Sequence, residues 1–235
     1  MRGATLRGAL GAAALAGAAL LAATPAAAQT APSAAEVAAY RGLHAAAQRG
    51  DAAEIARLAA TGASLDARDP QGRTPLHVAT FARQRTAVRA LAQAGARLDL
   101  LENERYDAVT IAAVADDPET LALLLSLGAS AKQVTSRYDG TALIAAAHLG
   151  HDEVVRQLIA AGAPLDHVNN LHWTAVIEAI VLGDGGLRHQ RTLDALVRAG
   201  ANLQLADREG RTPLALARAR GYTTMTQQLL QAGAR

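Results

Sequence analysis

Apolar residues recur along the chain at the three- and four-residue spacing of a helix face, and each such stretch ends at a glycine. Val154, Val155, Leu158 and Ile159 form one such stripe, which is followed by Gly162. Apolar positions at this spacing line one side of a helix, and a terminal glycine can adopt the left-handed backbone conformation that ends it. The pattern therefore predicts short amphipathic helices, each closed by a glycine.

The pair Gly-Ala marks the period of this pattern. It begins at residues 62, 95, 128, 162, 200 and 233, so successive copies are 33, 33, 34, 38 and 33 residues apart. A period of this length indicates stacked supersecondary units whose neighbours bury each other's apolar faces. We predict six units, at about residues 40–73, 74–106, 107–140, 141–173, 174–211 and 212–235.

A second signal follows each of the first five Gly-Ala pairs after about twelve residues, at Thr74, Asp107, Thr141, Thr174 and Thr212. The side-chain oxygen of threonine or aspartate can cap the free amides of a first helical turn. Turn residues such as Asp69-Pro70-Gln71-Gly72 precede these caps and favour a projecting hairpin. The cap, proline and acid of Asp117-Pro118-Glu119 begin a second helix. Each unit is thus predicted as hairpin, helix, turn and helix.

Three recurring submotifs resemble the ankyrin repeat. They are Thr74-Pro75-Leu76-His77-Val78-Ala79, Gly150-His151-Asp152-Glu153-Val154-Val155 and the Gly-Ala-x-Leu-Asp that begins at Gly62, and the resemblance runs from about Tyr40 to Arg235. It implies an all-α solenoid of six stacked helix-turn-helix units with β-hairpin fingers. In that family the fingers and inner helices usually form a concave binding face.

The sequences at both ends of the repeat array differ from those of the inner units. Ser33-Ala34-Ala35-Glu36 resembles a capping box, so residues 29–39 are predicted as an N-terminal lead and capping segment in which 29–32 are loose. Arg41-Gly42 stands where other units place their Thr-Pro. The last unit is predicted to be a polar cap, because polar residues stand among its apolar ones. These polar residues are Thr223, Thr224, Gln227, Gln228 and Gln231.

The first 28 residues have the pattern of a secretory signal. Arg2 and Arg7 are followed by an apolar, uncharged run from Gly8 to Ala23 and by Ala26-Ala27-Ala28, which fits a cleavage site. An uncleaved anchor is the alternative, although the run is shorter than the ~20 residues that a spanning helix needs. We therefore expect a periplasmic or secreted protein with no stable membrane insertion after cleavage.

Composition narrows the classes of function. The chain has 23 lysines and arginines, so 21 remain without Arg2 and Arg7, and these balance its 21 acidic residues. Nucleic-acid binding needs clustered cations, whereas acidic and basic residues are interspersed along this chain. Cysteine is absent, which excludes disulfides and thiolate chemistry. Only 3% of residues are aromatic, so alanine, leucine and valine must supply the burial.

The fingers of the middle units carry unusual residues for a turn. The finger before Thr141 has one extra residue, and His172 replaces the usual turn glycine of the next finger. Aromatic and arginine side chains dominate interface energies, so we expect a partner to contact Arg105, Tyr106, Arg137, Tyr138, His167, His172 and Trp173. The alternative is that Tyr138 and Trp173 pack finger against finger.

The fifth unit contains a second departure. Its longer spacing implies an inserted loop, Asp184–Arg188, between its two helices. Beside it, Glu178 occupies an inner-helix position at which other units have Ala45, Val78, Ile111, Ala145 and Leu216. A buried carboxylate needs a partner, which Arg188 or His189 would provide as a clamp; alternatively, Glu178 faces a ligand. We include His148, Glu178, Asp184 and Arg188 in the candidate binding surface.

Histidines are concentrated in the same region, since five of the seven lie between residues 148 and 189. His148 and His151, three residues apart, could bind a metal together with Glu178, Asp184 and His189. However, His44, His77 and His151 match positions at which the resemblance implies structural histidines, and few ligands remain. We predict neither a metal nor a cofactor.

The sequence contains none of the common catalytic motifs: there is no phosphate-binding glycine loop, H-E-x-x-H, G-x-S-x-G or C-x-x-C. The sequence thus predicts a non-catalytic module that binds an exported or envelope protein through the concave face and fingers of units 3–5. Two alternatives stay open: a small-molecule or metal pocket near Glu178 and the 184–188 loop, and an immunity or inhibitor protein for a neighbouring enzyme.

Overall fold

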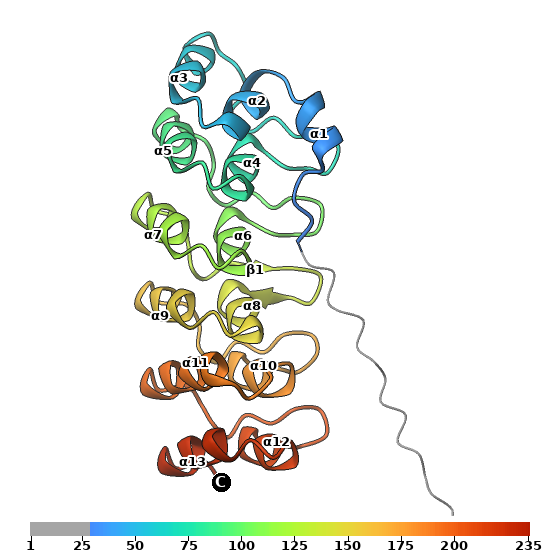
Figure 1. Cartoon of the computed structure of the whole chain (residues 1–235), viewed down its shortest axis with the longest axis vertical. Helices are drawn as coiled ribbons and strands as arrows, with labels where there is room; N and C mark the ends of the chain where they lie inside the picture. Colours follow the sequence, from blue (N-terminus) through green and yellow to red (C-terminus); the bar gives the residue numbers. More distant parts are fainter. Residues whose placement is uncertain (1–28) are drawn as a thin grey trace, which may run out of the picture.

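The structure, a computed structural model, describes residues 29–235; the predicted signal segment 1–28 lies outside this range. Helix pairs stack in two rows to form an elongated solenoid (Figure 1). The inner row consists of α2 (Gly42–Arg49), α4 (Pro75–Phe81), α6 (Ala108–Val114), α8 (Ala142–Leu149), α10 (Ala175–Val181) and α12 (Pro213–Ala219). The outer row consists of α3 (Ala52–Ala60), α5 (Arg85–Ala94), α7 (Pro118–Ser126), α9 (Asp152–Ala160), α11 (Leu187–Arg198) and α13 (Thr223–Gln231). The predicted helical solenoid is confirmed.

The predicted helix starts are confirmed by their hydrogen bonds. In α4, α6, α8, α10 and α12 the capping side chain accepts a bond from the amide three residues later, and the caps are Thr74, Asp107, Thr141, Thr174 and Thr212. Asp117 caps α7 in the same way. Ser33 and Glu36 form the predicted capping box at α1 (Ala34–Ala39), which precedes the first helix pair. These bonds are local, so a short stretch of sequence suffices to specify them.

The glycines of the six Gly-Ala pairs that mark the repeat between residues 62 and 234 have a positive φ, between 79° and 101°, after an outer helix. The stack between these turns is held by small side chains. Alanines of the inner helices, such as Ala79, Ala113, Ala146 and Ala179, are completely buried, and leucines and valines of the outer helices cover them. Each inner helix contacts the next, from α2 through α4 and onward to α12. Close approach of helices across alanine explains how the chain forms one continuous core with few aromatic residues.

The fingers differ in one respect from the predicted hairpins. Within residues 29–235, only β1 (Val134–Thr135) and β2 (Gly140–Thr141) pair as strands, in antiparallel register. The other fingers close through two backbone bonds around a turn, as from the amide of Asp69 to the carbonyl of Arg73 at 3.0 Å and from the amide of Gly72 to the carbonyl of Asp69 at 2.9 Å. Paired strands are thus confirmed in one of the predicted β-hairpins, whereas the other fingers of residues 29–235 are closed turns without paired strands.

Adjacent fingers are joined to one another by backbone hydrogen bonds. The amide of Asn103 donates to Gln71 at 3.0 Å, that of Ser136 to Arg105 at 2.8 Å, and that of Asn170 to Tyr138 at 2.9 Å. Because the backbone groups of neighbouring fingers satisfy each other, the fingers form one wall along the concave face.

The inserted segment of the fifth unit is partly helical, which corrects the prediction of a loop at 184–188. Helix α11 begins at Leu187, with Gly186 as its N-cap, so Leu187 and Arg188 belong to its first turn. Only Asp184, Gly185 and Gly186 remain in the connection. Arg188 therefore belongs to a helix of the outer row rather than to a loop beside the inner row.

The finger residue His172 has a φ of +63°, in the left-handed region where two other fingers have Gly72 and Gly210. We expect His172→Gly to raise the free energy of unfolding by about 1 kcal/mol, because a side chain in this conformation is strained by about that amount. Urea denaturation followed by circular dichroism measures the change. The reciprocal variant is Gly210→His, since Gly210 has a φ of +75° and open space around its would-be Cβ. It should lose a similar amount, and a gain in that variant would contradict the strain argument.

Candidate functional site

The concave face of the solenoid contains a pocket of about 280 Å³, bounded by the inner helices α6, α8 and α10 and by the fingers beside them. The helices contribute apolar side chains that include Val114, Ile144 and Ala145, while the fingers contribute Tyr106 and Tyr138. The pocket therefore has apolar walls with hydroxyl groups at its edge. It lies in units 3–5, where the sequence places the unusual finger residues.

Glu178 of α10 is the acidic residue of this pocket and is only 4% exposed. Its Oε1 accepts a hydrogen bond from Asn169 Nδ2 at 2.9 Å, whereas its Oε2 accepts none. His148 Nδ1 lies 3.5 Å from Oε2. Burial raises the pKa of Glu178 to about 7, and the bond from Asn169 only partly opposes this effect. The carboxyl group thus accepts one hydrogen bond, from an amide, in apolar surroundings that disfavour its ionised form.

His148 does not supply the missing charge. Burial lowers the pKa of its imidazole, and the neighbouring His189 and His151 lower it further. The imidazole is consequently neutral near pH 7, so it interacts with Glu178 as a polar group rather than as a cation.

The predicted clamp between Glu178 and the inserted segment is wrong. Arg188 donates to Asp116 at 2.7 Å and lies 3.7 Å from Asp152, because the first turn of α11 directs it toward the outer helices. His189 bonds to Asp184 at 2.8 Å and to the carbonyl of His148 at 2.9 Å. The segment therefore ties α11 to the turn before α7 and to α9, and neither it nor Trp173 lines the pocket.

The structure brings together four of the predicted binding residues and disperses the others. Tyr106, Tyr138, His148 and Glu178 line the pocket. Asp184 and Arg188 are exposed near the outer row. The finger residues Arg105, Arg137, His167 and His172 lie along the finger wall, and Trp173 is half-buried against the core.

Several of the finger residues hold neighbouring fingers together. Arg105 forms an ion pair with Asp139 at 3.2 Å, and Arg137 forms one with Glu104. His167 bonds to the carbonyl of Asp139 at 2.6 Å. These contacts between fingers involve residues other than Tyr138 and Trp173, for which packing was the alternative, and exposed pairs of this kind stabilise weakly and leave their side chains accessible.

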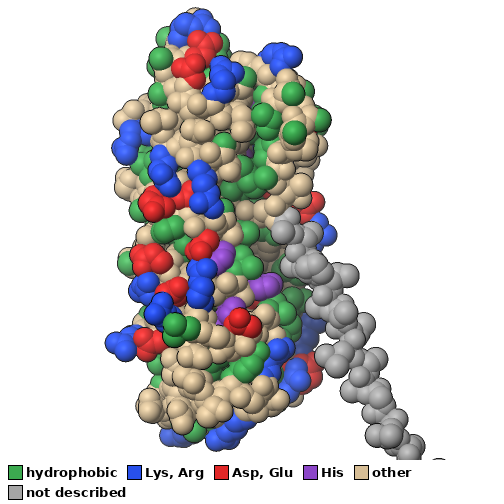
Figure 2. Space-filling model, in the orientation of Figure 1, with side chains coloured by type: hydrophobic (Ala, Val, Ile, Leu, Met, Phe, Trp, Pro, Cys, Tyr) green, Lys and Arg blue, Asp and Glu red, His purple; other side chains and the backbone are tan. Residues whose placement is uncertain are grey.

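Histidines gather midway along the solenoid, between acidic and basic side chains (Figure 2). Nevertheless, no group of three or more potential ligands between residues 29 and 235 is arranged to hold a metal ion. His151 and His189 each bond to a backbone carbonyl of a neighbouring unit. Buried His77 likewise bonds to Leu100, and His44 to Arg73, in the structural role that the family resemblance implied.

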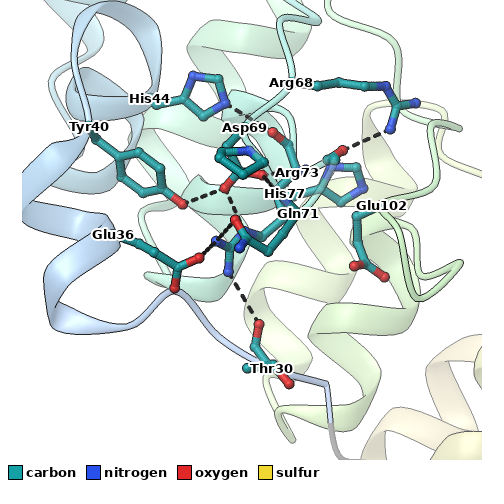
Figure 3. Close-up of polar contacts among 12 residues, drawn as sticks. Thr30, Glu36, Tyr40, His44, Arg68, Asp69, Gln71, Arg73, His77 and Glu102 are labelled. Atoms are coloured by element: carbon teal, nitrogen blue, oxygen red, sulfur yellow. Dashed lines mark hydrogen bonds and ion pairs between the residues drawn. The ribbon is translucent and has the colours of Figure 1, made fainter.

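A buried charge cluster near the N-terminus was missed in the sequence (Figure 3). Arg73 is 1% exposed, and its guanidinium donates to Asp69 at 2.7 Å and to Glu36 at 2.5 Å. Tyr40 donates to Asp69 at 2.8 Å. The signal for this cluster in the sequence was Arg73, the arginine that follows the turn of this finger. Because Glu36 belongs to α1 whereas Tyr40, Asp69 and Arg73 belong to the first unit, the cluster is a structural tie between α1 and the first finger.

The N-terminal lead also reaches the fingers. The carbonyl of Thr30 accepts a bond from Arg73 at 3.4 Å, and Gln29 lines the concave pocket. This placement differs from the loose lead predicted for residues 29–32. No helix within residues 29–235 has both the length and the apolar composition to cross a bilayer.

A family model described as "Ankyrin repeats (3 copies)" matches residues 20–102 and 108–197. The chain belongs to the ankyrin-repeat family. It is 38% identical over 125 residues to the ankyrin repeat protein YahD of Escherichia coli, a match that spans 53% of this chain and 62% of that protein. The chain thus covers less than two thirds of this relative.

Solved structures show the same ankyrin fold. An ankyrin repeat domain from Acinetobacter baumannii AYE superimposes with a TM-score of 0.77 and 44% identity, covering 82% of this chain and 98% of that domain. The ankyrin repeat domain of Bcl-3, a member of the IkappaB family, has a TM-score of 0.75 and 28% identity, over 83% of this chain and 87% of that one. Ankyrin-repeat proteins are generally non-catalytic modules that mediate protein–protein interaction.

Proposed function

We propose that this ankyrin-repeat protein binds another protein through the concave face of units 3–5. The observation that carries the proposal is the pocket itself, in which inner helices and finger tyrosines surround a poorly satisfied Glu178. Concave, mostly apolar sites with a few polar groups are typical of ligand binding. Hydrogen bonds between the fingers also hold this surface in place, so that little conformational entropy is lost when a partner binds.

We further propose that the partner is an exported or envelope protein. Support comes from the basic, apolar and alanine-rich pattern of residues 1–28, which is typical of a secretory signal. The near balance of acidic and basic residues in the rest of the chain favours a protein over a nucleic acid as the partner.

Blocking the pocket tests both proposals. Ala145 is half-buried on the pocket side of α8, and we expect Ala145→Trp to abolish capture of a partner because the indole fills the pocket. Envelope and cytoplasmic fractions of the native host are passed separately over the immobilised protein, and retained proteins are identified by mass spectrometry. A partner retained from the envelope fraction by the parent protein should be lost with this variant.

The matched control is Ala122→Trp, which adds the same side chain at an exposed position of α7 in the outer row. It should retain the partner. Equal retention by both variants would show that the concave pocket is not the binding surface, and a partner found in the cytoplasmic fraction alone would contradict the exported location.

A further inference from the structure

Two of the buried polar atoms that lack a hydrogen-bond partner within residues 29–235 line the concave pocket. They are Oε2 of Glu178 and Nε2 of Gln29. A buried polar group without a partner carries the full cost of its desolvation, so a ligand that bonds to it recovers that free energy. The carboxylate oxygen matters more, because Glu178 can hold a charge and lines the pocket although it is only 4% exposed.

The charges around the pocket favour a cation as the ligand of this oxygen. Of the residues that line the pocket, Glu178 is the only acid and His148 the only one that can become positive. Burial lowers the pKa of His148, which keeps the imidazole neutral near pH 7. Arg188, which was predicted to pair with Glu178, instead forms ion pairs with Asp116 and Asp152. No cation on the pocket wall therefore competes with one brought by a ligand.

The remaining walls suit an aliphatic stem. Val114, Ile144 and Ala145 present apolar surface, and Tyr106 and Tyr138 contribute rings from the fingers. Lysine and arginine side chains characteristically bury their methylene groups along such surface and place the charged head at a polar group. A cation on a flexible chain matches this combination better than a bare inorganic ion does.

The satisfied half of the carboxylate distinguishes lysine from arginine. Oε1 already accepts a hydrogen bond from Asn169, so a single oxygen of Glu178 is open. A guanidinium group binds carboxylates best as a fork that uses both oxygens, whereas an ammonium is a compact charge that needs one acceptor. The geometry thus favours a primary ammonium.

We propose that the pocket receives a lysine side chain of the protein partner, with its ammonium donating to Oε2 of Glu178 and its methylene stem between the finger tyrosines and α8. This inference rests on the proposed function, since it specifies the chemistry of the partner that the same face binds. It assigns to Glu178 the role of a specificity-determining residue.

Nuclear magnetic resonance titration of the full chain with N-acetyl-lysine N-methylamide tests this assignment. We expect shifts in the backbone amides of Ile144, Asn169 and Glu178, all of which belong to pocket residues. The norleucine analogue, whose side chain has the same four carbons but lacks the ammonium, should bind at least about tenfold more weakly, since a bond to a charged group contributes about 1.5–3 kcal/mol in proteins. The arginine analogue should also bind more weakly than the lysine probe.

Glu178→Gln keeps the acceptor that Asn169 uses and removes the charge, so it should reduce the affinity for the lysine probe to that for the norleucine probe. Glu119→Gln removes an exposed carboxylate of α7 and is the matched control, with unchanged affinity expected. Equal binding of the lysine and norleucine probes, or an unaffected Glu178→Gln variant, would overturn the inference. In that case loss of partner capture in Ala145→Trp would still support the concave face as a binding surface, so the two proposals fail separately.

Discussion

Arg73→Ala is expected to lower the free energy of unfolding by about 3–5 kcal/mol, because it leaves a buried carboxylate without its cation. The side chains of Arg73 and Asp69 are only 2% and 4% exposed, and their ion pair measures 2.7 Å. Burial alone would raise the pKa of Asp69, but the hydrogen bonds from Arg73 and Tyr40 hold it below its ordinary value. The carboxylate stays charged, and the stability of the folded protein therefore depends on the guanidinium that pairs with it.

Urea denaturation followed by circular dichroism gives the overall change, and hydrogen exchange of the α2 amides shows whether the loss is confined to the first units. Local loss is expected because a solenoid unit contacts only its neighbours. The matched control is Arg211→Ala, which breaks the same finger pair with Asp207 at a site where the arginine is 53% exposed. Because Arg211 is half exposed, its removal opens the carboxylate of Asp207 to water, and a smaller loss than in Arg73→Ala is expected. Equal losses in the two variants would contradict the role of burial.

Glu178→Gln is expected to remove a pH dependence of stability that the parent protein shows between about pH 4.5 and pH 7. Burial raises the pKa of Glu178 from its ordinary 4.5 to about 7 in the folded protein. Between these values the unfolded chain has released the proton that the folded protein still binds, so stability falls as the pH rises. The loss is complete above the folded pKa and amounts to about 3 kcal/mol, since each pKa unit corresponds to about 1.4 kcal/mol.

The difference in free energy of unfolding between the variant and the parent should therefore shift by about 3 kcal/mol in favour of Glu178→Gln when the pH is raised from about 4 to about 8. Urea denaturation at a series of pH values measures it. Glu209→Gln, which alters a finger carboxylate that is 63% exposed, serves as the control and should show no such shift. A difference in free energy of unfolding that stays constant across the pH series would mean that burial does not raise the pKa of Glu178.

Glu178 is therefore expected to destabilise the fold at the position where it favours a ligand. The equivalent positions in other units are filled by aliphatic residues such as Val78 and Ile111, which are completely buried. A sequence that retains a charged residue at a core-facing position departs from local consistency, and such departures are characteristic of functional sites. A lysine from a partner would offset the cost only in the complex.

Features that depend on a few consecutive residues followed from the sequence alone. The caps at Thr74, Asp107 and Thr141, and the glycines after the outer helices, are formed by hydrogen bonds and backbone angles within a single turn. Repetition of these signals with a constant period was sufficient to predict stacked helix pairs, because each amphipathic helix can bury its face only against a neighbour. The family of the chain was predictable for the same reason.

The partners of charged residues were decided by the tertiary structure. Asp69 with Arg73 and Asp207 with Arg211 occupy the same places in their fingers, yet only Arg73 is buried, because helix α1 and Glu36 cover it from more than 30 residues away. Arg188 pairs with Asp116, 72 residues distant, instead of with nearby Glu178. Local sequence determines which groups carry charge, whereas burial and partner choice depend on how distant units stack, and it is burial that governs both pKa and the cost of an unmet hydrogen bond.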